Sequence, residues 1–257
     1  MAVLSVDLAY RRWSDLGIVI LERAPGGTIA CEIVPMGLPG LDLLYDAERD
    51  RGPVDAEVLA GRLNHLCGMR DIRVMLLDGP QAWKSRTNGL EHARVSERVL
   101  NTAAKTGLPG MVKPITYRPF AEFCVDVYDA LCRRGWRRLA TSERAAVPRE
   151  RVLVESYPHA AWKALGLKPL PAKQRARVSD LAAAYGALRA VAPFTTNRPP
   201  NHDQLQAIVG GLPGLALEEC DVTGVRIVGN PPHREEGHWR EGFIVVPLPP
   251  RPNGGLG

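Results

Sequence analysis

Three short apolar runs stand close together at the start of the chain. They cover residues 3–7, 17–21 and 29–34, and the second connection between them contains Pro25-Gly26-Gly27. Apolar runs of this length, bounded by turn-forming residues, are typical of β-strands. Because the connections are short, the pattern predicts an antiparallel meander of three strands.

The rest of the chain alternates between helix-like and strand-like patterns. Between Pro53 and Gly68 apolar residues recur at helical spacing, with proline at the start and glycine just past the end. An apolar run over residues 74–78 predicts a strand that Gly79-Pro80 stops. By the same criteria we expect further helices at about 91–104, 120–131, 177–191 and 201–209, and further strands at about 152–155, 225–228 and 243–246.

This order of elements predicts an α/β fold. Three strands come first and strands then alternate with helices, which favours a mixed sheet, an antiparallel three-strand meander plus parallel strands, flanked by helices. The composition changes nowhere sharply enough to separate two domains. We therefore expect a single domain over residues 1–247, with a helical insertion at about 105–150, and a flexible Pro/Gly-rich tail over residues 248–257.

The composition is that of a soluble globular protein. Of the 257 residues, 45% are hydrophobic and 24% are charged, so the chain can build a core without disulfides or a structural metal. The five cysteines are scattered and form no CxxC pair, which excludes a zinc knuckle and a disulfide framework. The N-terminus has neither a basic segment nor a long apolar stretch. We expect no signal peptide, no membrane span and a cytoplasmic location.

Positive charge is concentrated in the middle of the chain. Residues 111–200 hold 16 Lys/Arg against 7 Asp/Glu, whereas residues 1–110 hold 13 against 14 and residues 201–257 hold 4 against 7. A basic segment of this kind suits the binding of phosphate groups, and a solvated helix face is the alternative interpretation.

Three of the predicted strands end on an acid. Asp7, Asp78 and Glu155 each follow an apolar run directly. Ligand sites in α/β sheets lie outside the carboxyl ends of the strands, and neighbouring strands are about 4.8 Å apart. Buried carboxylates that close repel each other and call for a cation, for which Mg²⁺ (or Mn²⁺) is suited by its preference for oxygen ligands. Three or four carboxylates would also accommodate two metals about 3.5–4 Å apart.

Each acid also has a purely structural interpretation. Asp7 and Asp78 could cap or start a turn, although glutamate is a poor turn former and Glu155 fits that role less well. Asp203 is a fourth candidate for the site. Asn201 before it can act as N-cap, which places Asp203 in a first helical turn where any anion is favoured.

Several of these motifs resemble one family. The chain is similar to the predicted nucleases of the domain of unknown function 429 family, in the ribonuclease H-like superfamily. The resemblance extends over nearly the whole chain, and its most specific motif is Glu-x-Tyr-Pro-His, here residues 155–159. The family's opening strand that ends in Asp is similar to Ser5-Val6-Asp7, and its Asp-Ala-Pro motif is similar to residues 76–80. Its Arg-x-x-acid-Arg motif resembles residues 94–98, and its His-Asp-x-x-Asp-Ala motif resembles residues 202–207. The basic stretch with Lys173 and Arg177 also has a counterpart in the family.

The resemblance implies a ribonuclease H-like fold and a divalent-metal-dependent nuclease. Such an enzyme hydrolyses phosphodiester bonds of RNA, DNA or a hybrid by a one- or two-metal mechanism. Where the family has a second acid in its last motif, this chain has Gln206, which removes a negative charge. The metal ligands that the resemblance implies are Asp7, Asp78, Glu155 and Asp203. His159 would move a proton or make a structural hydrogen bond. The basic residues would contact phosphates or lie on solvated helix faces, and they are Arg94, Arg98, Lys173 and Arg177.

Two other functions remain open at this point. A non-catalytic nucleic-acid-binding module would keep the fold with an incomplete metal site, and Gln206 favours this interpretation. A nucleotide phosphotransferase of actin-like fold would need a glycine-rich phosphate loop after the first strand, and residues 9–13 contain no glycine. The sequence indicates neither the oligomeric state nor the type of nucleic acid.

Overall fold

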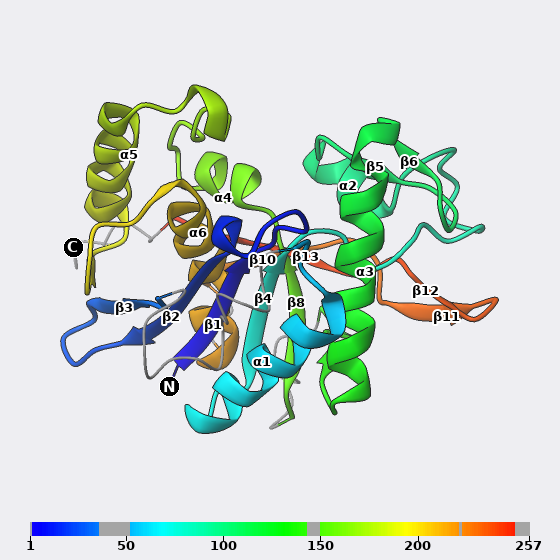
Figure 1. The fold of residues 1–257 in the computed structure, drawn as a ribbon, viewed down its shortest axis with the longest axis horizontal. Coiled ribbons are helices and arrows are strands. Elements are labelled where there is room, and N and C mark those ends of the chain that lie inside the picture. The colour runs from blue at the N-terminus through cyan, green and yellow to red at the C-terminus, as the bar shows by residue number, and fades with distance from the viewer. Residues whose placement is uncertain (1, 36–51, 143–149, 221–222, 250–257) are drawn as a thin grey trace, which may run out of the picture.

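A mixed β-sheet runs through the centre of the computed structural model, which describes residues 2–35, 52–142, 150–220 and 223–249 (Figure 1). Its strand order is β10-β13-β8-β4-β1-β2-β3-β9. The first three strands form the expected antiparallel meander, and β4 and β8 continue the sheet parallel to β1. The predicted mixed sheet, an antiparallel three-strand meander plus parallel strands, is therefore confirmed. The bounds are β1 Ala2–Asp7, β2 Gly17–Arg23, β3 Ile29–Ile33, β4 Val74–Asp78 and β8 Val152–Ser156.

Shorter strands extend this sheet at both sides. Each of them pairs with β3, β8 or β13, and β9 has only three residues. β13 (Ile244–Pro247) is parallel to β8, β10 (Val225–Val228) antiparallel to β13, β9 (Phe194–Thr196) parallel to β3, and β7 (Arg137–Arg138) parallel to β8.

Helices cover both faces of the sheet, since alternate side chains of each strand point to opposite faces. Val3 packs toward α6 (His202–Glu218), whereas Leu4 packs toward α1 (Ala56–Met69) and α3 (Arg118–Arg133). α4 and α5 pack against α6 on the first face, and α4 also contacts β13 (Figure 1). The remaining helices are α2 Val95–Leu100, α4 Pro158–Ala164, α5 Val178–Val191, and the 3₁₀ turns η1 Trp13–Asp15, η2 Ile115–Tyr117 and η4 Lys173–Arg175.

α6 is much longer than the short helix expected over residues 201–209. The sequence places Gly210, Gly211, Pro213 and Gly214 directly after it, a pattern that usually ends a helix. In the structure these residues lie buried against the sheet. A Cβ at Gly211 would stand 2.2 Å from Leu21 Cδ1, so glycine is what allows helix and sheet to come this close. Tertiary packing overrides the local preference.

The helix expected at 91–104 is reduced to α2. The Glu97 side chain accepts a hydrogen bond from the Arg94 backbone N–H at 3.0 Å, so the helix begins just after Arg94. Asn101, with φ of 50°, ends it in the left-handed conformation. Two hairpins follow at this side of the molecule, to the right of β8 in Figure 1. They are β5 (Lys105–Thr106) with β6 (Val112–Lys113), and β11 (His233–Glu235) with β12 (His238–Arg240).

Two further predictions concern the C-terminal tail and membrane-spanning helices. The flexible tail proposed for residues 248–257 falls mostly outside the described residues, which stop at 249. In the described part of the chain, no helix has both the length and the apolar character needed to cross a membrane.

Candidate active site

Two aspartates form the centre of the site. Asp7 and Asp78 end β1 and β4, and the parallel register of the two strands places them directly opposite each other. Their carboxyl groups lie close enough for each to influence the pKa of the other. Burial, together with the charge of Asp78, raises the pKa of Asp7 well above its ordinary value, and burial raises the pKa of Asp78 to about 7. We call these two residues the acid pair.

Asp203 joins the acid pair from α6, which covers the face of the sheet to which Asp7, like Val3, points. It lies in the first turn of α6, which the Asn201 side chain caps by accepting the Gln204 N–H at 2.9 Å. Its charge contributes to the raised pKa of Asp7. Gly17 is opposite Asp7 in the sheet, and a Cβ there would stand 2.3 Å from the Asp203 carbonyl oxygen. Only glycine therefore lets the start of α6 lie against this strand end.

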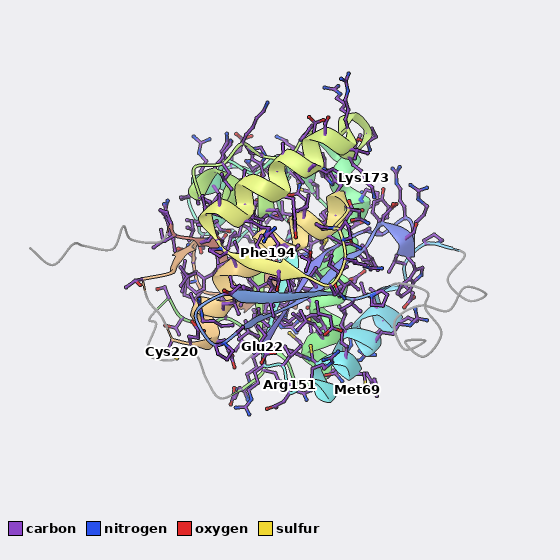
Figure 2. The ribbon with its side chains drawn as sticks, turned by 90° about the vertical axis from the view of Figure 1, so that its left-hand side faces the viewer. Glu22, Met69, Arg151, Lys173, Phe194 and Cys220 are labelled. Carbon is purple, nitrogen blue, oxygen red and sulfur yellow. The ribbon has the colours of Figure 1, made fainter. Side chains whose placement is uncertain are left out.

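A lysine compensates the charge of Asp203. The ammonium group of Lys173, in η4, contacts the Asp203 carboxylate and also Asp15 Oδ1 at 2.9 Å. Both partners raise the pKa of Lys173 above its ordinary value, although burial opposes them, so the lysine stays charged. Figure 2 shows Lys173 at the opposite end of the molecule from Met69 and Arg151, which lie near the amino ends of the parallel strands.

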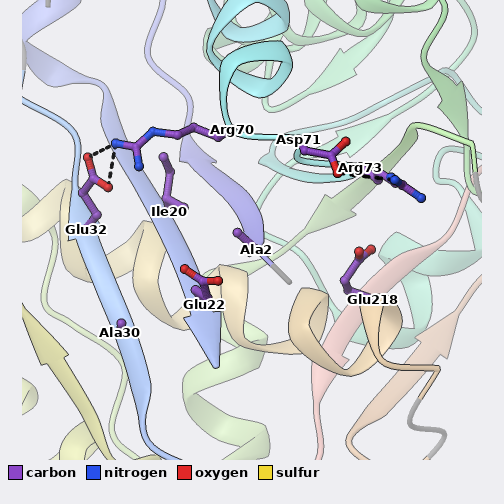
Figure 3. A pocket seen from close by; sticks show the side chains of 9 residues that line it. All are labelled: Ala2, Ile20, Glu22, Ala30, Glu32, Arg70, Asp71, Arg73 and Glu218. Carbon is purple, nitrogen blue, oxygen red and sulfur yellow. Dashed lines mark hydrogen bonds and ion pairs between the residues drawn. The ribbon is translucent and has the colours of Figure 1, made fainter. Parts of the chain in front are cut away.

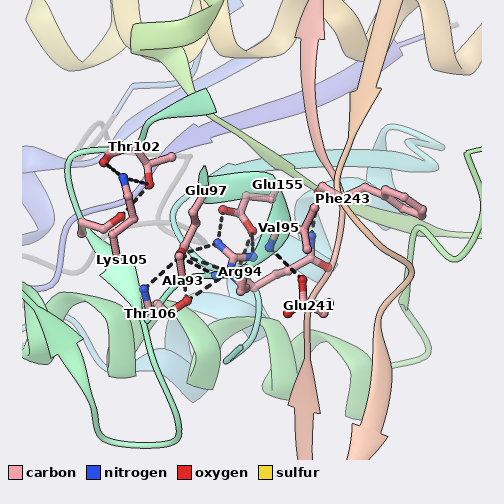
Figure 4. A network of polar contacts seen from close by, with 12 residues as sticks. Ala93, Arg94, Val95, Glu97, Thr102, Lys105, Thr106, Glu155, Glu241 and Phe243 are labelled. Atoms are coloured by element: carbon pink, nitrogen blue, oxygen red, sulfur yellow. Dashed lines mark hydrogen bonds and ion pairs between the residues drawn. The ribbon is translucent and has the colours of Figure 1, made fainter. Parts of the chain in front are cut away.

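Glu155 has a different environment from the acid pair. It is 3% exposed, and Arg94 donates to its two oxygens at 2.6 and 2.7 Å (Figure 4). The Gln81 backbone N–H adds a third hydrogen bond at 3.0 Å. Burial still raises its pKa, against the lowering effect of Arg94, and its charge helps to raise that of Asp78. Glu155 thus lies close to the acid pair with its own cation already bound.

Arg94 is the centre of a buried network that continues away from the sheet. Its guanidinium also donates to Glu97 at 2.9 and 3.1 Å, and Glu97 accepts from the Thr106 N–H at 2.9 Å. Glu241 accepts from the Val95 N–H at the start of α2 (Figure 4). Glu97 and Glu241 were not among the expected site residues. The Arg-x-x-acid spacing of residues 94–97 was the available signal for Glu97.

The other expected residues are dispersed. Arg98 is exposed on α2, and exposed Arg177 precedes α5 as its N-cap. His159 is exposed in α4, where burial and the charge of Lys163 lower its pKa. The amide oxygen of Gln206 accepts from Trp162 Nε1 at 2.8 Å, one helical turn beyond Asp203.

A cavity opens directly beside the acid pair, and we call it the side cavity. Its volume is about 420 Å³, and Asp78, Gln206 and His159 are among the residues that line it. A second cavity, of about 330 Å³, lies at the opposite edge of the sheet, where Arg70 binds both oxygens of Glu32 at 2.8 and 2.9 Å (Figure 3). That edge holds the amino ends of β1 and β4, whereas the side cavity adjoins Asp78 and Glu155.

The acid pair has the donors that a hard divalent cation requires. Mg²⁺ typically binds one or two protein carboxylates and completes its shell with water and substrate phosphate. Burial raises the pKa of both Asp7 and Asp78, so a bound cation would favour their ionised forms, and Asp203 is available once Lys173 releases it. Among the described residues, no cluster of three or more Asp, Glu, His or Cys side chains is assembled closely enough to hold a metal by itself. The pair fits a site that is completed by substrate.

Comparisons with known proteins add only distant similarity. No protein-family model matches the chain, and no curated protein does, so the resemblance to the domain of unknown function 429 family rests on the motifs alone. Three solved structures are similar: a Thermus thermophilus RuvC (12% identity, TM-score 0.37, covering 85% of this chain and 96% of that chain), the yeast mitochondrial Holliday junction resolvase Ydc2 (10%, 0.40, 81% and 76%), and T. thermophilus RuvC in complex with Holliday junction substrate (12%, 0.37, 86% and 98%). Overlap at this level does not assign an activity.

Proposed function

We propose that the protein is a divalent-metal-dependent nuclease that hydrolyses phosphodiester bonds in nucleic acid. The observation that supports this most strongly is the acid pair: Asp7 and Asp78 lie opposite each other at the carboxyl ends of adjacent parallel strands, and both have raised pKa values. Two neighbouring carboxyl groups inside a protein are costly to ionise without a cation. Perturbed groups of this kind in or beside a cavity are characteristic of functional sites.

Each residue then has a role that follows from its position. Asp7 and Asp78 would hold Mg²⁺ or Mn²⁺, with Asp203 as a further ligand, and the bound cation supplies Lewis-acid polarisation of a phosphoryl oxygen. Lys173, released from Asp203, is placed to contact the phosphate. Glu155 stays paired with Arg94 and fixes the end of β8, so its contribution is to position the neighbouring strand ends.

His159 and the arginines have weaker geometric support. His159 lines the side cavity and its lowered pKa keeps it neutral near pH 7, so it can accept a proton from a group bound there. Arg94 is fully engaged inside the protein. The exposed cations near the site, Lys163 and Lys173, are better placed for phosphate contacts than Arg94.

A cleavage assay with matched variants tests the proposal. The protein is incubated with Mg²⁺ or Mn²⁺ and single-stranded, duplex, hybrid and branched nucleic acids. We expect cleavage of at least one substrate, and its loss by about 10²-fold to 10³-fold in Asp7→Asn and Asp78→Asn, since removing one transition-state-stabilising group has effects of about this size. Asp71→Asn is the control, because Asp71 is an exposed acid beside the cavity of Figure 3. Cleavage that survives in the acid-pair variants would contradict the proposal.

One observation favours a second function, a non-catalytic nucleic-acid-binding module. Gln206 stands where the resembling family has an acid, and Trp162 occupies its amide oxygen. Binding of nucleic acid with no cleavage in either metal, unchanged in Asp78→Asn, would support this alternative.

A further inference from the structure

The side cavity is larger than the acid pair needs for a metal and a phosphate. It extends from Asp78 along the start of α4 to the loop after α2 and the start of α3. Its volume of about 420 Å³ is within the range of pockets that enclose an organic ligand. The ligand must therefore have a part that occupies space beside the reacting phosphate.

Aromatic side chains form much of the wall. Tyr117 from η2, Phe120 from α3 and Tyr157 before α4 all line the side cavity. The rings of Tyr157 and His159 are 5.9 Å apart with an interplanar angle of 39°, so they present adjoining faces. Proteins bind unstacked bases by stacking them on such side chains, and the contribution is about 1–3 kcal/mol for each base.

The polar groups of the cavity suit the edge of a base and the adjoining backbone. Gln206 and Asn101 line the cavity with amide groups, and since Trp162 holds the Gln206 oxygen, the amide nitrogen of Gln206 remains as a hydrogen-bond donor. Lys163 is the exposed cation in the lining. Aromatic faces, amide donors and a cation together match a nucleotide better than they match a lipid or a sugar.

The position of the cavity decides which nucleotide can enter. Because Asp78 belongs both to the acid pair and to the cavity lining, a base in the cavity brings its own phosphate next to the acid pair. A base stacked within a duplex cannot enter a pocket of this kind without leaving the helix, and that step costs least for an unpaired base. We propose that the side cavity binds the base of one unpaired nucleotide adjoining the scissile phosphodiester. This inference rests on the proposed nuclease function and names its substrate class.

A binding experiment in EDTA tests the base site without cleavage. The probes are a duplex with one unpaired 2-aminopurine, the same duplex with that base paired, and single strands of DNA and RNA that contain 2-aminopurine. We expect the unpaired probes to be quenched on binding and to bind about 5-fold to 150-fold more tightly than the paired duplex, the range that 1–3 kcal/mol of stacking implies. A difference between the DNA and RNA strands identifies the preferred sugar.

Three variants separate the base site from general binding. Tyr117→Ala removes one wall at a position that is 41% exposed, and Ala103→Trp fills the cavity from an exposed loop position in its lining. The control is Ile115→Ala, in the same 3₁₀ turn but 65% exposed and outside the lining. We expect both cavity variants to lose the preference for unpaired probes and to keep their affinity for the paired duplex, while the control behaves as wild type.

The possible failures are distinguishable. Equal affinity for paired and unpaired probes, or full quenching in both cavity variants, overturns the base site. If the wild type also cleaves paired duplex with Mg²⁺ and Asp78→Asn does not, the nuclease function stands without it. If the preference for unpaired probes depends on Tyr117 but no substrate is cleaved, the base site stands and the nuclease function fails.

Discussion

The three acids that the sequence predicts at strand ends fall into two environments that the sequence does not distinguish. Asp7 and Asp78 do end their strands, whereas Glu155 stands one residue before the end of β8, opposite Leu77. Glu155 is held by both nitrogens of the Arg94 fork and by a backbone N–H, so its charge is compensated inside the protein. Asp7 and Asp78 lie opposite each other on neighbouring strands; burial raises the pKa of both, and the charge of Lys173 offsets this only in part at Asp7. The charge of Glu155 is balanced within the protein, whereas the charge of the ionised acid pair would be balanced only by a bound ligand.

This difference separates a structural acid from a candidate catalytic one. A buried acid with a cationic partner is tolerated as long as that partner remains, and removal of the partner lowers the free energy of unfolding strongly. An uncompensated pair destabilises the protein until something binds. Changes that remove charge should therefore have opposite effects on stability in the two places.

The largest effect is expected from Arg94→Met. The substitution leaves Glu155 and Glu97 buried without their cation, and we expect a loss of about 3–5 kcal/mol in the free energy of unfolding, measured by urea denaturation. Arg98→Met, on the same short helix but exposed, should change it by less than about 0.5 kcal/mol. Equal losses in the two variants would show that the network around Arg94 is not what stabilises this region.

At the acid pair, removal of charge should stabilise the protein instead of destabilising it, and the effect should depend on pH. Burial raises the pKa of Asp78 to about 7 from its ordinary value of 3.8, so folding favours its protonated form. Its stabilising contribution is full below about pH 4 and is lost as the pH rises through about 7. We expect the Tm without metal to fall more between pH 5 and pH 8 in wild type than in Asp78→Asn.

Divalent metal should reverse this loss. Mg²⁺ binds the ionised pair of the folded protein, so it should raise the Tm of the wild type more at pH 8 than at pH 5. Asp71→Asn again serves as the control. A Tm of Asp78→Asn with the same pH slope and the same response to Mg²⁺ as wild type would contradict the uncompensated state of the pair.

A smaller effect is expected from Lys173→Met. The ammonium of Lys173 competes with any cation for the Asp203 carboxylate, so its removal should tighten Mn²⁺ binding by about threefold to tenfold in calorimetry, which corresponds to a modest ion-pair energy. Lys168→Met removes the same charge five residues earlier and should leave the affinity unchanged. Weaker Mn²⁺ binding in Lys173→Met would mean that the lysine holds Asp203 in place for the metal.

The smallest effect is expected from an ion pair on the surface. Arg118 and Glu122 are one turn apart on α3, joined at 2.8 Å and both about half exposed. Glu122→Gln should reduce the free energy of unfolding by less than about 0.5 kcal/mol, since solvent screens the pair. A loss near that of Arg94→Met would show that burial does not account for the difference between the two kinds of ion pair.

The long strands and the position of the acids could be predicted from the sequence. β4 has the predicted bounds, and Asp7 and Asp78 end their strands as expected, because a buried apolar run that stops at a polar residue is a strong local signal. The two- and three-residue strands could not be predicted, since they are too short for any periodicity and form by pairing with existing elements.

The state of each site residue depends on contacts that are remote in sequence. Arg94 was expected at a phosphate and lies buried against Glu155, 61 residues away. Lys173 contacts Asp203 across 30 residues. The walls of the side cavity come from η2, α3 and α4, and no single segment contains the pattern. Local periodicity carries no information on such pairings.

Gly17 has a consequence for how this site should be recognised in other sequences. Its missing side chain leaves the space that the Asp203 carbonyl oxygen occupies. Replacing it with alanine changes no charge and removes no ligand, yet the added methyl group would force the start of α6 away from Asp7. A sequence search based on the acids alone would also select proteins in which a larger residue at this position keeps the counterpart of Asp203 away from that of Asp7. Glycine at this position therefore belongs to the signature of the site on equal terms with the aspartates.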